Sequence, residues 1–277
     1  MPLLRRRKPP DAVTAVTTRN YLFAADDVSS QTTQLIATAA RVTGFMKGAP
    51  GGHRPGWYRP GADNSAVLGQ LYQHLAETYP KAGPAFWAVR LWTNFLWQPA
   101  YLAVIAAHIH SSMPDLGQLS QRVHGIYADG YRLPAGPQQA GTPEQLIAIA
   151  ATALRPFCAS LLEEINTLVK LKPLPARRLM ADRMLSIIAR LPQWQPGVTA
   201  AMAEDYAQLW LTALGLAGQG RLDRIGVGGG REVVIVTRKG CCLDYLIEPK
   251  AYCASCPKQG EEARIARQTA NAVAELD

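Results

Sequence analysis

Long apolar runs are rare in this chain of 277 residues. The stretch from Leu91 to Pro114 contains no Asp, Glu, Lys or Arg. However, Thr93, Asn94 and Gln98 interrupt it before it reaches the ~18 apolar residues that a membrane-spanning helix requires. We therefore expect a buried core helix in this stretch rather than a membrane span.

The N-terminus also lacks the pattern of a secretory leader. The basic residues Arg5 to Lys8 are followed at once by Pro9, Pro10 and Asp11, where a signal peptide would place an apolar segment of ~7–15 residues. We therefore expect a cytoplasmic protein.

Charged residues are few, and one sign prevails. Only 18% of the residues are charged and 48% are hydrophobic, with a mean hydropathy of −0.05, so the chain can bury a core and is not disordered over most of its length. Lys and Arg number 29 against 21 Asp and Glu. Because four of these cations lie between Arg5 and Lys8, we interpret residues 1–25 as a flexible basic arm, which also allows peripheral association with the inner membrane.

Motifs for nucleic-acid binding are missing. The sequence has no helix-turn-helix turn, no zinc-finger spacing and no aromatic strand of the RNA-recognition type. We therefore expect no nucleic-acid partner, although the pI is near 9.4.

Helical periodicity dominates the chain as far as Gly218. The clearest helix start is a capping box formed by Thr142, Pro143 and Gln145. We expect Pro99 to end one helix or to begin another. The predicted helices cover residues 29–46, 63–79, 84–107, 142–171 with a disturbance at Pro156, 175–191 and 197–216. A short hairpin with an Asp129-Gly130 turn is predicted within residues 123–133.

The pattern changes after Gly218. Residues 232–237 are mostly β-branched and predict a strand. Lys239-Gly240 is a candidate two-residue turn, and residues 242–247 are expected to return as the second strand of a hairpin. A closing helix is predicted over residues 261–276, with Ile265 and Val273 facing inward.

These patterns predict a mainly α protein with a small β component, an α+β fold. We divide it into the arm of residues 1–25, a helical domain of residues 26–218, and a C-terminal module of residues 219–277 packed on the helical domain. The module would contain the hairpin, the cysteines and the closing helix.

Cysteine is scarce but clustered. Four of the five cysteines are Cys241, Cys242, Cys253 and Cys256. Because the cytoplasm keeps thiols reduced, this cluster favours a metal site over a disulfide framework. Cys158 lies among apolar residues and is predicted to be a buried structural thiol.

Spacing alone leaves the metal open. Cys253 and Cys256 form a C-x-x-C pair, which serves zinc and iron equally. The adjacent Cys241 and Cys242 would point to opposite faces of a regular strand. Such a pair suits a structural zinc site poorly, whereas a dinuclear cluster accommodates thiolates that leave the backbone in divergent directions.

The run CCLDYLIEPKAYCASCP resembles the C-terminal motif of bacterial ferric-siderophore reductases of the FhuF type. The spacing of the four cysteines matches, as do the aromatic Tyr252 before the third cysteine and Pro257 after the fourth. The resemblance covers about Arg231 to Gln259. It implies that Cys241, Cys242, Cys253 and Cys256 hold a [2Fe–2S] cluster that follows a largely helical N-terminal region.

The resemblance also implies a reaction. One electron would pass from the cluster to Fe(III) in a siderophore, and Fe(II) would then leave because hard oxygen donors bind it less well. Positive charges near the thiolates would favour the reduced cluster or meet an anionic ferric chelate. We name Arg238, Lys239, Lys250 and Lys258 as candidates for this role.

No further catalytic group is expected. The five histidines, His53, His74, His108, His110 and His124, show no metal-ligand spacing. The glycines from Gly226 to Gly230 precede a strand instead of joining a strand to a helix, so they do not form a dinucleotide site. We therefore expect a separate electron donor, a reductase or a ferredoxin.

Two other functions fit parts of the pattern. A structural Cys₄ zinc protein with a basic surface for nucleic acid would be colourless and would unfold on chelation. A thiol oxidoreductase would use Cys253 and Cys256 alone, but the βαβ context of such enzymes is not evident. A Cys241→Ser substitution separates the thiol oxidoreductase from a cluster protein, because a redox C-x-x-C would keep its activity whereas a cluster would be lost or altered.

Overall fold

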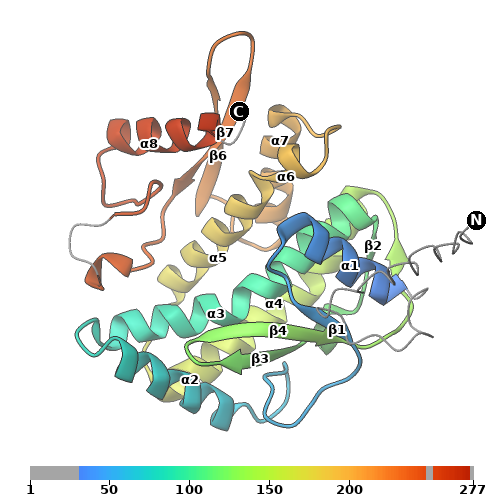
Figure 1. Cartoon of the computed structure of the whole chain (residues 1–277), viewed down its shortest axis with the longest axis vertical. Helices are drawn as coiled ribbons and strands as arrows, with labels where there is room; N and C mark the ends of the chain where they lie inside the picture. The colour runs from blue at the N-terminus through green and yellow to red at the C-terminus, as the bar shows by residue number, and fades with distance from the viewer. Residues whose placement is uncertain (1–30, 248–251, 275–277) are drawn as a thin grey trace, which may run out of the picture.

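The fold is α+β, as predicted, and is described from a computed structural model for residues 31–247 and 252–274. The arm of residues 1–25 and Lys250 lie outside the described residues. The helices are α1 Gln31–Thr43, α2 Ser65–Thr78, α3 Gly83–Ile105, α4 Pro143–Leu168, α5 Pro173–Ile188, α6 Leu191–Trp194, α7 Ala200–Ala213 and α8 Glu261–Ala274. The strands are β1 Gly48–Pro50, β2 Ser112–Met113, β3 Ser120–His124, β4 Tyr127–Leu133, β5 Gln139–Ala140, β6 Gly220–Gly226 and β7 Glu232–Arg238. Figure 1 shows the C-terminal elements β6, β7 and α8 grouped at one end of the molecule.

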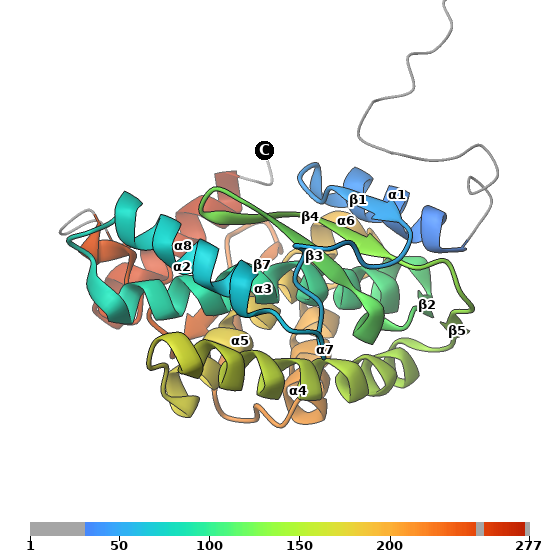
Figure 2. The ribbon, with the colours of Figure 1, turned by 90° about the horizontal axis from the view of Figure 1, so that it is seen from below.

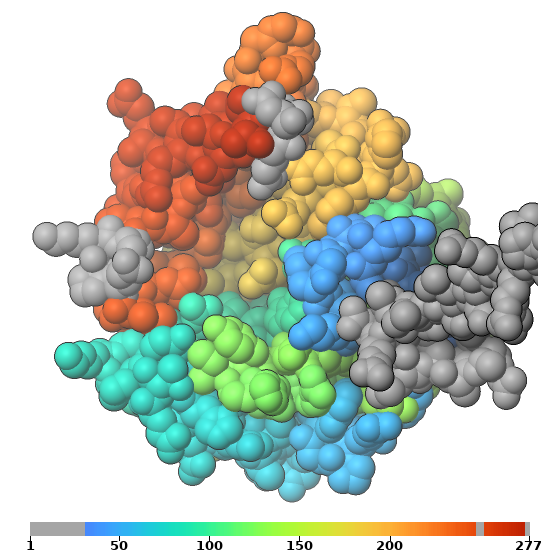
Figure 3. All heavy atoms as spheres, in the orientation of Figure 1, coloured from blue at the N-terminus to red at the C-terminus, as the bar shows by residue number. Residues whose placement is uncertain are grey.

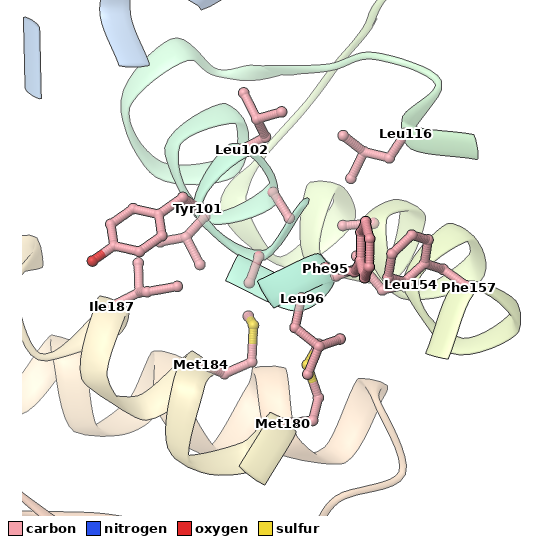
Figure 4. Packing of buried hydrophobic residues seen from close by; sticks show 14 of the residues in the cluster. Phe95, Leu96, Tyr101, Leu102, Leu116, Leu154, Phe157, Met180, Met184 and Ile187 are labelled. Carbon is pink, nitrogen blue, oxygen red and sulfur yellow. The ribbon is translucent and has the colours of Figure 1, made fainter. Parts of the chain in front are cut away.

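Helix α3 is the centre of the core. It contacts α2, α4 and α5, and Figure 2 shows it between the β3–β4 hairpin and α4. Phe95 and Leu96 of α3 pack in the same cluster as Phe157 of α4 and Met180 and Met184 of α5 (Figure 4). The expected buried helix near Leu91 is therefore confirmed.

Pro99 neither ends nor begins a helix, contrary to the prediction. Helix α3 continues through it, although proline has no N–H to donate to the carbonyl four residues earlier. That carbonyl belongs to Phe95, and it accepts a hydrogen bond of 3.1 Å from Gln121 Nε2 on β3 instead. A buried side chain from the sheet thus replaces the missing backbone bond.

The predicted capping box begins α4. The backbone N–H of Thr142 donates to Gln145 Oε1 at 2.9 Å, and the N–H of Gln145 donates to Thr142 Oγ1 at 3.4 Å. The helix runs through Pro156 without a break. By length and composition alone α4 could cross a membrane, with a mean hydropathy of 1.5 over its most apolar window. Core helices of soluble proteins pass the same test, and α4 packs against α3 and α7.

The predicted hairpin near Gly130 exists, but the predicted position of its turn was wrong. Strands β3 and β4 pair antiparallel, with His124 opposite Tyr127, so the turn falls at Gly125 and Ile126. Asp129 and Gly130 lie within β4. Strand β1 adds to the other edge of β4 in parallel, which places Lys47 beside the sheet.

The C-terminal hairpin also differs from the prediction. Strand β7 pairs with β6 in antiparallel register from Gly220 opposite Arg238 to Gly226 opposite Glu232, and the glycines after Gly226 form the turn. Residues 242–247 do not return as a strand, because the described backbone there forms a 3₁₀ turn over Asp244–Leu246. The closing helix α8 covers β7, with Ile265 and Val273 half-buried.

A buried histidine joins α7 to the core. His108 lies in a π-helical turn, Ala106–His110, that extends α3. Trp210 Nε1 donates a hydrogen bond of 2.9 Å to His108 Nε2. Burial lowers the pKa of His108 to about 4, so the ring is neutral at pH 7.

Candidate metal centre

The backbone just before the first two cysteines is tied to helix α5 by Asp182. Its Oδ2 accepts hydrogen bonds from the Gly240 N–H at 2.8 Å and from Arg238 Nε at 3.2 Å, and its Oδ1 accepts one from the Lys239 N–H at 3.3 Å. The Asp182 side chain is only 3% exposed. One buried carboxylate of the helical body therefore sets where the chain leaves β7.

Glycine is required at position 240. A Cβ at this position would lie 2.5 Å from Asp182 Oδ2 and 3.0 Å from the Leu179 nitrogen, closer than real side chains allow. Just beyond the cysteine pair, Leu243 adopts a left-handed conformation with φ of 61°, uncommon for a branched residue. The chain is thus held close to α5 just before Cys241 and changes direction just after Cys242, so the two adjacent cysteines do not lie in a regular strand that would point them to opposite faces.

The second pair of cysteines sits in a tight turn. The Cys256 N–H donates to the Cys253 carbonyl at 3.0 Å, and Gln259 Nε2 donates to the same carbonyl at 2.7 Å. Cys256 is 3% exposed, whereas Cys253 is exposed. The turn places the Cys253 thiol beside Arg238 at the end of β7.

The two pairs meet through Cys242 and Cys253. A hydrogen bond shared by their thiols lowers the pKa of Cys242 to about 6 and raises the pKa of Cys253. Burial raises the pKa of Cys241, which also feels the charges of Cys242 and Cys256. All four clustered cysteines therefore interact electrostatically.

Three of the four cations named from the sequence lie at this site. Arg238 Nη1 is 3.7 Å from Cys253 Sγ; burial opposes its charge, but Asp182 and the thiols together raise its pKa. Lys258 lies over the Tyr245 ring at 4.5 Å and interacts with Cys241. Lys239 Nζ donates to the Gly218 carbonyl at 2.7 Å. Lys250, the fourth, is outside the described residues.

The donor set fits an iron–sulfur cluster. Four thiols on two short segments supply the ligands that such clusters use, and the positive charges of Arg238 and Lys258 suit a cluster of net negative charge. No three His, Cys, Asp or Glu side chains of residues 31–247 and 252–274 are already close enough together to hold a metal ion. The thiols are thus gathered at one place without forming a closed ligand shell.

Two hollows open beside the cysteines. On one side, Cys242 and Cys253 line a hollow of about 190 Å³ with Arg90, Arg183 and Arg238. On the other side, Cys241 lines a hollow of about 410 Å³ whose charged residues are all lysine or arginine. The clustered cysteines therefore line two separate hollows.

Sequence reasoning missed the residues of the helical body that hold the module. Asp182 is one, and Arg90 is another, since its Nη2 forms an ion pair of 2.7 Å with Asp244 Oδ1 just beyond the cysteines. A signal for Asp182 was present: it is the one acidic residue of α5 and lies three residues from Leu179 and from Leu185, both buried. A carboxylate on such a face needs a partner.

Comparison with known proteins identifies the module. Residues 238–258 match a family model described as the FhuF 2Fe-2S C-terminal domain, and this range contains all four clustered cysteines. No solved structure matches the chain. The matched domain confirms the resemblance seen in the sequence, associates the chain with siderophore-iron reduction and indicates a [2Fe–2S] cluster. Residues 238–258 of the C-terminal module are therefore similar to an iron–sulfur domain of the FhuF type.

Proposed function

We propose that the protein is a ferric-siderophore reductase. A [2Fe–2S] cluster held by Cys241, Cys242, Cys253 and Cys256 supplies one electron at a time. The electron reduces Fe(III) in a siderophore to Fe(II), which the siderophore holds less tightly. The observation that carries the proposal is the family match over residues 238–258, together with the hollow that two of its cysteines line.

The protein's own residues have distinct tasks in this proposal. The thiols of the four cysteines bind iron as thiolates. Arg238, held by Asp182, places positive charge beside Cys253 and so favours the reduced, more negative state of the ligand set. The hollow beside Cys242 and Cys253 brings a chelate close to the thiolates, so no general acid or base is needed.

The helical body and the module divide the work. We propose that the domain of residues 26–218 binds the chelate and that the module of residues 219–277 carries the cluster. A separate reductase or ferredoxin supplies electrons in the cytoplasm, the arm of residues 1–25 permits contact with the inner membrane, and nucleic acid is not a partner.

The proposal is tested on anaerobically purified protein. We expect a red-brown protein with about two irons and two sulfides, which gives an electron paramagnetic resonance signal only after reduction. Mixing the reduced protein with a ferric siderophore should restore the oxidised spectrum, and an Fe(II)-specific dye should trap one Fe(II) for each electron lost.

A matched pair of variants makes the test specific. Cys242→Ser should lose the colour and the reduction of Fe(III). Cys158→Ala should keep both, because Cys158 lies on α4 away from the module and burial raises its pKa to about 12. A colourless protein that binds one zinc would overturn the proposal, and so would a red protein whose reduced form no ferric siderophore reoxidises.

A further inference from the structure

Three adjoining hollows form a continuous cleft that leads away from Cys242 and Cys253. The hollow beside these cysteines, about 190 Å³, shares Arg90, Thr93 and Arg183 with a second of about 160 Å³. The second shares Trp97, Tyr127 and Arg183 with a third of about 460 Å³. Arg183 lines all three, so we name the whole the Arg183 cleft. In Figure 3 the surface is hollowed where the blue residues near β1, the green β3–β4 hairpin and the yellow α5 meet.

Arg183 carries a positive charge that no described residue neutralises. Other cations along the cleft are paired: Arg90 with Asp244 at 2.7 Å, Arg238 with Asp182 at 3.2 Å, and Lys47 with Asp129 at 3.2 Å. Arg183 makes no hydrogen bond or ion pair with residues 31–247 or 252–274. Burial lowers its pKa, as do its neighbours Arg238 and Arg90. A half-buried arginine that lines open hollows and has no ion-pair partner among the described residues offers its charge to an anionic ligand.

The far end of the cleft is aromatic. Phe45 lies 5.7 Å from Trp97 and 5.3 Å from Tyr101 between ring centroids. Trp97 is fixed by a hydrogen bond of 3.2 Å from its Nε1 to the Ala128 carbonyl. Phe45 is 42% exposed and Tyr127 is 59% exposed. Exposed rings that line one hollow suit a ligand with flat aromatic groups.

We propose that the Arg183 cleft binds an anionic ferric chelate with aromatic oxygen-donor arms, a catecholate siderophore. The proposal deepens the reductase function and rests on it for the identity of the ligand as a ferric chelate. Three catecholates carry six negative charges, of which Fe(III) cancels three. Three hydroxamates carry three charges, and Fe(III) cancels them all. Only the catecholate complex offers both the anion for Arg183 and the rings for Phe45 and Trp97.

The test uses Ga(III) complexes, which match Fe(III) in charge and size but are not reduced. Calorimetric titration of the cluster-loaded protein should show Ga(III) tris-catecholate binding at least about tenfold more tightly than neutral Ga(III) tris-hydroxamate. Arg183→Met should weaken catecholate binding at least about 30-fold and leave hydroxamate binding unchanged. Arg155→Met is the matched control, because Arg155 is an exposed cation on α4 outside the cleft.

Each outcome decides a separate question. The catecholate proposal would be overturned if the hydroxamate complex bound as tightly as the catecholate complex or more tightly, or if Arg183→Met bound the catecholate complex as well as wild type does. The reductase function would still stand in that case if a ferric hydroxamate reoxidised the reduced protein. Catecholate binding as expected, with no ferric chelate reduced, would overturn the reductase function alone. If Arg183→Met loses its cluster, Phe45→Ala decides the question, since removal of this exposed ring should weaken catecholate binding about tenfold.

A second inference comes from the separate hollow that Cys241 lines. Lys170, Lys172, Arg178 and Lys239 line it beside Cys241. No Asp or Glu is among its described lining residues, and none of the four cations forms an ion pair with a described residue. Its floor is apolar, with Val89, Leu171 and Leu243.

We infer that this basic hollow docks an acidic electron-donor protein. An apolar centre within a ring of unpaired cations is complementary to an acidic rim around an apolar patch. The contact would bring the donor to Cys241 while the Arg183 cleft remains open for the chelate. Electrons would then enter from one side of the cysteine module and leave from the other.

Stopped-flow reduction by a plant-type ferredoxin of net negative charge tests this inference. The double variant Lys170→Glu/Lys172→Glu should slow reduction by the ferredoxin at least about tenfold at low salt and leave reduction by dithionite unchanged. Arg41→Glu/Arg155→Glu changes the net charge equally at exposed sites outside the hollow and should have little effect. Equal slowing in both double variants, or none in the first, would overturn the inference.

Discussion

The helical body and the cysteine module are built on opposite principles. In the body, the side chains that α2, α3, α4, α5 and α7 turn inward form one apolar cluster. In the module, only Cys256 and Arg264 are buried among the described residues from Cys241 to the end of α8. Hydrophobic burial can hold the body and the β6–β7 hairpin together, but it contributes little to the described residues from Cys241 onward.

The module must therefore be stabilised by other means. Strands β6 and β7 join the apolar cluster of the body through Leu222 and Val236. The segment that carries the cysteines is tied to the body by the ion pairs of Arg238 with Asp182 and of Arg90 with Asp244. Metal binding by thiolates adds folding free energy where a core is lacking. The comparison predicts that the module responds to loss of metal and of polar contacts, while the body responds to changes in packing and protonation.

The largest expected effect is the loss of one cysteine ligand. Cys253→Ser should abolish the visible absorption of the cluster and, with it, the order of the module. Hydrogen exchange should show faster exchange throughout α8 but unchanged protection in α3 and α5, whose core does not depend on the metal. Equal loss of protection in both regions would show that the two regions form one cooperative unit.

The next effect concerns the carboxylate that joins the regions. Asp182→Ala removes the acceptor of three hydrogen bonds and leaves Arg238 only 15% exposed without its partner. We expect a loss of about 4 kcal/mol in the free energy of docking the module. Urea titration followed by the cluster absorption should show an earlier transition than titration followed by far-UV circular dichroism. The loss of docking free energy in Asp182→Asn, which keeps an acceptor, should lie between zero and the loss in Asp182→Ala. Coincident transitions by the two probes in Asp182→Ala would contradict the expectation.

A smaller effect on the body comes from pH. The folded state keeps His108 neutral with a pKa of about 4, whereas the unfolded chain binds a proton near pH 6.5. The unfolded state therefore binds more protons between these values, so stability falls as the pH drops through this window. From pH 7 to pH 5 we expect a loss of about 2 kcal/mol from this residue. Urea unfolding of wild type and His108→Gln at both pH values measures it, and the variant should show the weaker dependence on pH.

The smallest effect tests the body alone. Thr142→Ala removes the cap of α4 and should lower the free energy of unfolding by about 1 kcal/mol. The iron content and visible spectrum should not change, because no residue of α4 lines either hollow beside the four clustered cysteines. Loss of iron in this variant would mean that the stability of the module depends on the stability of the body, contrary to the separate stabilisation of the two regions described above.

Local signals in the sequence predicted much of the body. The capping box at Thr142 could be predicted, and is confirmed, because its two hydrogen bonds involve residues only three apart in the sequence. The course of α3 through Pro99 was not predictable, because the compensating donor is Gln121, more than twenty residues away. Propensity describes neighbours along the chain and contains no information on such a partner.

The module shows the same limit. The β-branched run of β7 predicted a strand, but its partner β6 contains few β-formers, with Leu222 buried and charged residues on either side. Pairing was therefore assigned to the wrong segment, residues 242–247. The cysteines were evident from spacing, whereas Asp182, Arg90 and Arg183 become part of the site only when α3 and α5 pack together.

The attachment of Gly240 to Asp182 has a consequence for how the holoprotein is made. Asp182 belongs to a helix of the body, so the position from which Cys241 and Cys242 leave β7 is set by protein contacts alone. A newly synthesised chain that has folded its body already presents this thiol pair to the machinery that delivers iron and sulfide. In the proposed cluster protein we therefore expect Cys241 and Cys242 to bind iron first and Cys253 and Cys256 to complete the ligand set.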